Sequence, residues 1–219
     1  MPLRVQNPLV SESPSAARAD VQRLEPAERD RALASVVAAF AVDPLLRWVW
    51  PEDERYAECA PAFFALLLDL RRHGGEVWAA RGGAAVAMWD PPGGLYAAPA
   101  EDPWPGLQAS FTEAERARWA AFDAAMAVPA GVPAYWYLGV LATSPDQQGQ
   151  GIGSAVLAPV LGAADRTGTA AWLETMSERN VGFYARLGFV VAREVDLPDG
   201  GPRCWLLHRE PRGEDPTGG

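Results

Sequence analysis

A glycine-rich segment, Gln147 to Ser154, has the residue types that a phosphate-binding turn requires. Glycine lets the backbone turn tightly and brings successive N–H groups close to an anion. The segment lies between a predicted strand at 135–143 and a predicted helix at 151–166, so the free N–H groups and the positive end of the helix dipole suit a pyrophosphate. A Rossmann dinucleotide site is the main alternative. The Gly-x-Gly-x-x-Gly pattern is absent, however, and the strand lies late in the chain.

The composition narrows the chemistry further. The chain has 219 residues, 49% of them hydrophobic and 21% charged, which is typical of one globular domain with a sizeable core. All 19 basic residues are arginines, so a Schiff-base lysine and the lysine of a Walker loop are excluded. The 28 acidic residues give a formal net charge of −9. This charge argues against a nucleic-acid partner, because binding a phosphate backbone usually requires a basic face.

Metal, disulfide and membrane chemistry find little support in the sequence. Cys59 and Cys204 are too few and too far apart for a disulfide framework or a zinc site, and His73 and His208 are the only histidines. We therefore expect no metal. The N-terminal residues do not read as a secretory signal, and the longest apolar stretch, 32–42, is too short to cross a bilayer. The sequence predicts a cytoplasmic protein with no membrane partner.

The hydrophobic pattern predicts the elements that must position the turn. The predicted strands cover 20–24, 76–80, 84–89, 135–143, 170–175, 189–196 and 203–209, and the predicted helices cover 26–40, 53–72, 112–126, 151–166 and 179–187. Asp43-Pro44 ends the first helical region, because the residue before proline avoids the helical conformation. The strand–helix–strand order from 135 to 175 is that of a βαβ unit and implies a locally parallel pair of strands.

The same pattern divides the chain into three parts. Residues 1–18 and 211–219 lack periodicity and are expected to be flexible tails, while 19–210 form the domain. Within the domain, residues 90–133 are rich in proline and glycine and are expected to form an irregular insertion or lid.

Two segments resemble the GNAT (GCN5-related) N-acetyltransferase family. Gln148-x-x-Gly151-x-Gly153, which follows LATSPD, is similar to motif A of the family, whose turn holds the pyrophosphate of acetyl-CoA. The segment ERNVGFYARLGF, residues 178–189, is similar to motif B. The resemblance covers about Leu24 to His208 and is weakest over 90–133. It implies an α/β GNAT fold, in which helices flank a mixed, twisted sheet with splayed parallel strands.

The resemblance also implies roles for individual residues. The backbone of Leu141 to Thr143 would pair with the pantetheine arm, and one N–H there would polarise the thioester carbonyl. Asn180 would contact the CoA arm, and Tyr184 would protonate the departing thiolate. Gln150 replaces a basic residue that the family often has, so either the affinity for pyrophosphate is lower or an arginine elsewhere supplies the charge. The residues expected to bind the cofactor are Leu141, Ala142, Thr143, Gln148, Gly149, Gln150, Gly151, Ile152, Gly153, Ser154, Asn180 and Tyr184.

Each of the catalytic candidates also has a purely structural interpretation. Tyr184 fits a core position on an amphipathic helix beside Phe183 and Leu187, and Asn180 fits a helix cap. Glu174 ends a predicted strand, where it is either a solvated residue or the carboxylate that accepts, through water, the proton of an incoming ammonium. Such a base is needed because a free alkyl amine is protonated near pH 7.

The resemblance implies acetyl transfer from acetyl-CoA to a primary amine of a small molecule, by direct attack. The expected acceptor is an antibiotic or an aminonucleoside such as puromycin, held by Asp43, Trp48 and Trp136 in an aromatic-walled pocket, although an aspartate before proline also fits a simple turn. Two alternatives stay open. One is an acetyltransferase for a different metabolite or a protein N-terminal amine. The other is a catalytically silent acyl-CoA-binding module. The chain is expected to act as a monomer or a homodimer.

Overall fold

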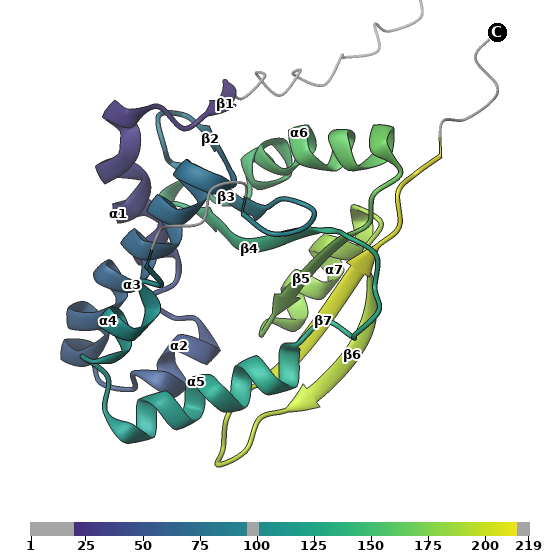
Figure 1. Cartoon of the computed structure of the whole chain (residues 1–219). Helices are drawn as coiled ribbons and strands as arrows, with labels where there is room; N and C mark the ends of the chain where they lie inside the picture. Colours follow the sequence, from purple (N-terminus) through teal and green to yellow (C-terminus); the bar gives the residue numbers. More distant parts are fainter. Residues whose placement is uncertain (1–19, 96–100, 214–219) are drawn as a thin grey trace, which may run out of the picture.

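The computed structural model describes residues 20–95 and 101–213, which form a mixed α/β fold around one sheet (Figure 1). This confirms the predicted fold class. The sheet order is β1-β2-β3-β4-β5-β7-β6. The strands are β1 (Val21–Arg23), β2 (Glu76–Ala80), β3 (Ala85–Asp90), β4 (Trp136–Thr143), β5 (Ala171–Thr175), β6 (Val190–Asp196) and β7 (Arg203–Arg209). The helices are α1 (Arg29–Ala39), α2 (Pro44–Val49), α3 (Asp53–Gly74), α4 (Trp104–Gln108), α5 (Glu113–Met126), α6 (Ile152–Thr167) and α7 (Glu178–Arg186), with short 3-10 turns η1 (Pro26–Glu28) and η2 (Pro145–Gln147).

The strands β4 and β5 form the parallel pair that the βαβ pattern predicts. Their ladder is short, since it joins Trp136 to Ala171, Tyr137 to Trp172 and Leu138 to Leu173 and ends there. The remainder of β4 keeps its pairing with β3 on the opposite edge. The two parallel strands therefore separate after Leu138, which opens the middle of the sheet.

A β-bulge at Gly139 marks the point of separation. Met88 of β3 is paired with Val140 and Trp89 with Leu138, which leaves Gly139 as the extra residue on β4. An extra residue reverses the alternation of side chains between the two faces of a strand. Leu138 accordingly packs in one core cluster, whereas Val140 packs in the other.

The two faces of the sheet are covered by different sets of helices (Figure 1). The helices α6 and α7 pack on one face, around a core that includes Val156, Leu157 and Tyr184. The helices α1, α2, α3 and α5 enclose a larger, aromatic-rich core on the other face, which includes Phe63, Phe64 and Trp50. Side chains of β4 and β5 that point to this second face are therefore buried beneath the first half of the chain.

Most predicted elements are found within two residues of their expected bounds, but the chain has helices that the prediction missed. The Asp43-Pro44 pair does end the first helical region, yet it also begins α2, because the Asp43 carboxylate accepts hydrogen bonds from the N–H groups of Leu45 and Leu46. The first predicted helix begins as η1 and continues as α1 from Arg29. The expected N-terminal tail lies outside the described residues, as do 214–219 of the C-terminal tail.

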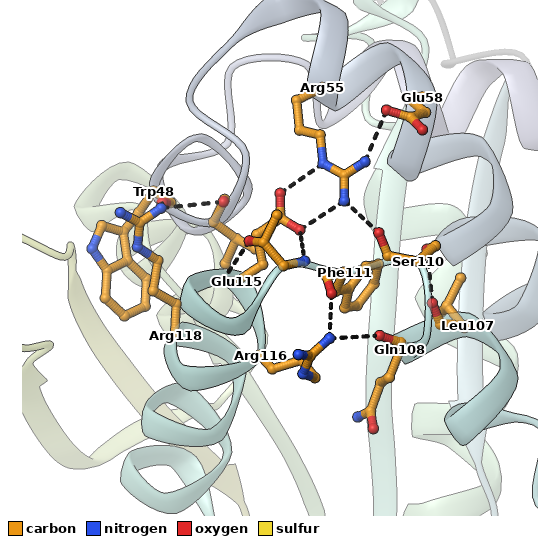
Figure 2. A network of polar contacts seen from close by, with 12 residues as sticks. Trp48, Arg55, Glu58, Leu107, Gln108, Ser110, Phe111, Glu115, Arg116 and Arg118 are labelled. Carbon is orange, nitrogen blue, oxygen red and sulfur yellow. Dashed lines mark hydrogen bonds and ion pairs between the residues drawn. The ribbon is translucent and has the colours of Figure 1, made fainter.

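The expected irregular insertion contains the helices α4 and α5, and polar contacts fasten it to the rest of the domain (Figure 2). Arg55 of α3 binds both carboxylate oxygens of Glu115 at 2.7 Å and donates to the carbonyl of Ser110 at 2.7 Å. Arg118 of α5 donates to the carbonyl of Trp48 at 2.9 Å. Because Glu115 is buried, its ion pair with Arg55 is shielded from water and holds α5 against α3.

Candidate functional site

The glycine-rich turn leads from β4 through η2 into α6, as the sequence predicts. Gly149 and Gly151 both have φ of +77°, a conformation that favours glycine, and Gly151 is the N-cap of α6. A Cβ at either position would meet nothing within 4 Å, so these glycines are required by the backbone and not by a lack of space. The turn is exposed, and the first N–H groups of α6 have no partner within the helix. An anion can therefore approach it.

An arginine lies beside this turn on a different element. Arg81, in the hairpin between β2 and β3, donates through Nη1 to Oε1 of Gln147 at 3.1 Å and to Oε1 of Gln150 at 2.5 Å. The backbone at Arg81 is left-handed, with φ of +51°, and two glycines with positive φ follow it. This hairpin geometry carries a positive charge to the turn, which has none of its own.

The stretch Leu141 to Thr143 lies on the part of β4 that has separated from β5. Its β3 edge is paired, and the carbonyl of Thr143 also accepts a hydrogen bond from Nε2 of Gln148 at 3.2 Å. On the other edge the ladder with β5 has already ended at Leu138. An extended ligand could therefore add to this edge of the strand in the way that a further strand would.

A cavity of about 340 Å³ reaches the same junction from the opposite face of the sheet. Its wall includes Glu174 of β5, Tyr137 and Gly139 of β4, and Arg71 of α3. The remainder of the wall is rich in aromatic rings, contributed by Phe40, Phe63, Phe64, Trp104, Phe111, Trp119 and Phe122. Figure 1 shows α3, α4 and α5, which supply five of these rings, gathered with α1 on this side of the sheet, and Phe40 and Phe111 lie just after α1 and between α4 and α5. A planar apolar group with a polar end fits such a wall.

Glu174 and Tyr137 form a hydrogen-bonded pair in this cavity. The parallel register places Trp172 opposite Tyr137, so Glu174, two residues further on, lies on the same face and within reach. The phenol of Tyr137 donates to Oε2 of Glu174. Burial raises the pKa of Glu174 to about 7, although the hydrogen bond from Tyr137 and the charge of Arg71 both lower it. Burial, and then the carboxylate of Glu174, raise the pKa of Tyr137 well above its usual value.

Two further carboxylates line the cavity. Asp43 is the N-cap of α2, and burial raises its pKa to about 6 in spite of its two backbone hydrogen bonds. Burial also raises the pKa of Asp123 on α5. Asp123 and Tyr137 additionally line an adjoining cavity of about 440 Å³. The cavity therefore has three carboxylates in its wall, those of Asp43, Asp123 and Glu174.

Arg71 and Asp90 form an ion pair at the edge of the cavity. Nη2 of Arg71 lies 2.8 Å from Oδ2 of Asp90, and the Arg71 side chain is only 9% exposed. Burial raises the pKa of Asp90, an effect that the nearby Arg71 charge opposes. Among the described residues that line the cavity, Arg71 is the only one with a cationic side chain.

The structure places Tyr184 and Asn180 on α7, across the sheet from the cavity. Tyr184 is buried against the rings of Phe183 and Phe189, and burial, with a smaller contribution from the charge of Glu174, raises its pKa. Asn180 is exposed and donates to Oγ1 of Thr175 at 3.4 Å. The alternative that Asn180 caps the helix is not what the structure has, because the N-cap is Ser177.

The structure brings only some of the predicted substrate-binding residues to the cavity. Asp43 lines the cavity, but Trp48 and Trp136 do not. Trp136 is buried in the core beneath α6, and Trp48 lies under the Arg118 guanidinium. Trp104 also lines the cavity, as expected for an aromatic residue near the irregular segment. Asp123 belongs to the cavity as well, and nothing in the sequence distinguishes its carboxylate from those of surface residues.

The described residues have neither a membrane-spanning helix nor a cluster of metal ligands. Within 20–95 and 101–213, no helix combines the length and apolar character needed to cross a bilayer. Across the same residues, no cluster of three or more histidine, cysteine or acidic side chains has the arrangement of a metal site.

Comparison with known proteins gives consistent relatives. The sequence model of the acetyltransferase (GNAT) family matches residues 24–189. A structure from Corynebacterium glutamicum, described as histone acetyltransferase HPA2 and related acetyltransferase, is 26% identical with a TM-score of 0.66, over 89% of this chain and 97% of that one. Arylalkylamine N-acetyltransferase 2 from Aedes aegypti is 10% identical with a TM-score of 0.58, over 88% and 98% of the two chains, a likeness of fold alone.

Proposed function

Because the chain belongs to the GNAT acetyltransferase family, which uses acetyl-CoA, we propose that it transfers an acetyl group to the primary amine of a small cationic molecule that carries an aromatic group. The observation that carries this proposal is the position of Glu174. Its partly buried carboxylate lies where β4 and β5 separate, in a cavity lined by aromatic rings and two further carboxylates.

Acetyl-CoA supplies an acetyl thioester, and the residues around the separated strands fit it. The exposed turn from Gln148 to Ser154 would hold the pyrophosphate through backbone N–H groups, with Arg81 as the neighbouring cation. The free edge of Leu141 to Thr143 would pair with the pantetheine arm, and one N–H there would polarise the thioester carbonyl. Asn180, exposed at the start of α7, would contact the arm.

Glu174 would act as the general base. An alkyl ammonium must lose a proton before it can attack a thioester, and a carboxylate with a pKa of about 7 accepts that proton much more readily than one with the usual value near 4.5. Tyr137 would hold the carboxylate at a fixed position through its hydrogen bond. The proton would pass to Glu174 directly or through one water molecule.

Tyr184 would act as the general acid for the departing thiolate. Its phenol has an ordinary pKa near 10, which burial raises further, so it is protonated at neutral pH, as a proton donor must be. Helix α7, which carries Tyr184, packs against β5, which carries Glu174, so the acid and the base would act from opposite faces of the sheet.

The acceptor cavity supports an aromatic amine as the substrate. Asp43 and Glu174 would attract the ammonium, and the rings of Phe63, Trp104 and Trp119 would stack on a planar group. The segments AAFAVDP, GGAAVAMW, SPDQQGQGIGSAVLAPVL and WLETMSERNVGFYARLGF also resemble puromycin N-acetyltransferase in the same order along the chain. We therefore propose an aminonucleoside of the puromycin type as acceptor, and antibiotic resistance as the biological role.

A comparison of amines tests this proposal. Rates of acetyl transfer to puromycin, 2-phenylethylamine and n-butylamine would be measured with the wild-type chain and with Asp43→Asn. We expect the two aromatic amines to be acetylated faster than butylamine, and Asp43→Asn to raise the KM of the aromatic amines with little change in the KM of acetyl-CoA. Faster acetylation of butylamine would contradict the aromatic acceptor, while leaving the acetyltransferase chemistry in place.

A further inference from the structure

Arg71 is a buried cation to which the proposed function gives no role. It lies in the last turn of α3, where Nη2 binds Asp90 and Nη1 donates to the carbonyl of Leu67 at 3.4 Å. Its Nε is buried without a hydrogen-bond partner among the described residues. Burying a guanidinium is unfavourable unless its charge is used, because apolar side chains of similar size fill such a place at lower cost.

The bulge in β4 makes room for this guanidinium. A Cβ added at Gly139 would lie 2.9 Å from Cζ of Arg71 and 3.3 Å from its Nε, so a larger residue at the bulge would displace the side chain. Gly139 adjoins Leu138, the last residue of the β4–β5 ladder, and lines the same cavity as Glu174. The separation of the strands, the bulge and the buried charge thus meet at one position.

We propose that Arg71 is a positioning residue for the amine-deprotonation step. Its guanidinium supplies the positive charge that faces the Tyr137–Glu174 pair from α3. This inference rests on the proposed role of Glu174 as base. Asp90 holds the guanidinium from β3, and Gly139 leaves the space for it. Arg71 does not touch the reacting amine in this account. It acts through Glu174, whose carboxylate its charge favours.

The other charged and titratable groups around Glu174 do not supply such a charge. They are Tyr137 on β4, Asp90 on β3, Asp123 on α5, Asp43 before α2, Tyr184 on α7 and Cys204 on β7, none of them a cation. The imidazole of His208 on β7 stacks on Trp172 and lies beside the carboxylate of Glu210. Without Arg71, hydrogen bonds from Tyr137 and from the backbone would still favour the carboxylate form of Glu174, but no nearby positive charge would. The base would then be protonated over much of the neutral range, and fewer molecules could accept a proton.

Titration of the Glu174 carboxyl by ¹³C NMR tests the inference without any substrate, so its result is separate from whether the chain acetylates a given amine. The key variant is Arg71→Met combined with Asp90→Asn, which removes both charges and leaves no unpaired buried carboxylate. We expect the Glu174 midpoint to rise by about one pH unit or more in this variant. Asp90→Asn alone, which leaves the Arg71 charge without its counterion, is expected to lower the midpoint.

The two opposite shifts also keep the test falsifiable if the double variant does not fold, since Asp90→Asn and Arg71→Lys can be measured in its place. Arg71→Lys keeps the charge and should leave the midpoint close to that of the wild type. With puromycin as acceptor, the acidic limb of the kcat/KM profile should move with the midpoint in each variant. A midpoint that does not respond to either charge would overturn the inference, as would a loss of rate that is equal at every pH.

Discussion

Tyr137 and Glu174 lie on neighbouring parallel strands, and the phenol of Tyr137 donates a hydrogen bond to the Glu174 carboxylate just past the last pair of the β4–β5 ladder. The pair therefore sits where the two strands separate. The free edge of β4 is accessible at the same junction, while the acceptor cavity opens above it. In our account this junction is where the amine loses its proton and meets the thioester.

The raised pKa of Glu174 predicts that the base destabilises the fold at alkaline pH. Its pKa is about 7 in the folded chain against 4.5 ordinarily, so the folded state binds the extra proton between these values. Stability is therefore full below about pH 4.5 and falls as the pH rises through 7. We expect Glu174→Gln to increase the free energy of unfolding by roughly 2–3 kcal/mol at pH 8 and to change it little at pH 5.

Urea unfolding at the two pH values measures this difference. Glu210→Gln, which changes an exposed carboxylate, serves as the control and should have no such pH dependence. Equal effects of Glu174→Gln at pH 5 and pH 8 would show that the carboxylate is not destabilised by burial.

Tyr184→Phe tests the general acid. Removing the hydroxyl should lower kcat by about 10- to 10⁴-fold, because no group would protonate the leaving thiolate, while CoA binding changes little. Phe183→Leu, which disturbs the packing of the Tyr184 ring and leaves its hydroxyl, is the matched control. If Tyr184→Phe kept the wild-type kcat, Tyr184 would be a core residue only.

Gly153→Val tests the turn. A Cβ at Gly153 would lie 3.5 Å from Oγ1 of Thr143, an ordinary contact, so the variant should fold. Its branched side chain would occupy the start of α6 and weaken CoA binding at least tenfold, about 1.4 kcal/mol. Gly162→Val makes the same change later in α6 and should bind CoA normally. Calorimetric titration with CoA compares the affinities of the two variants. If Gly153→Val bound CoA with wild-type affinity, the turn would not be the pyrophosphate site.

Arg81→Gln tests the charge beside the turn. Loss of the guanidinium should weaken CoA binding about tenfold or more, as charged hydrogen bonds contribute about 1.5–3 kcal/mol. The KM of S-acetylpantetheine, which has no phosphate, should be unaffected. Arg186→Gln removes a charge from α7 without contact to the turn and is the control. If the KM values of acetyl-CoA and S-acetylpantetheine rose by the same factor in Arg81→Gln, Arg81 would support the hairpin and would not bind a phosphate.

The sequence alone predicts the architecture well because the relevant signals are local. Alternating and helical spacing of apolar residues locates most strands and helices, and the glycines at 149–153 indicate the turn between β4 and α6. The helix α2 was missed for a physical reason that is also local. An aspartate before proline ends one helix, and the same pair can begin the next, with Asp43 as N-cap and Pro44 at the first position.

The acceptor side of the site could not be predicted in the same way. Tyr137, Arg71 and Asp123 come from elements that are distant in the chain, and their proximity depends on the parallel register and on the bulge at Gly139. Nothing in the local sequence distinguishes a bulge glycine from an ordinary strand glycine. Tryptophans such as Trp136 are equally ambiguous, since an aromatic residue in a strand can face the core or a cavity.

The most direct test of the central claim is thiol release from acetyl-CoA, measured with and without puromycin and a panel of small amines, for the wild-type chain and for Glu174→Gln. We predict amine-dependent release that yields the N-acetylated amine, with Glu174→Gln slower by at least tenfold near neutral pH. CoA binding without release in the presence of any amine would contradict the account and would leave a silent acyl-CoA-binding module in its place.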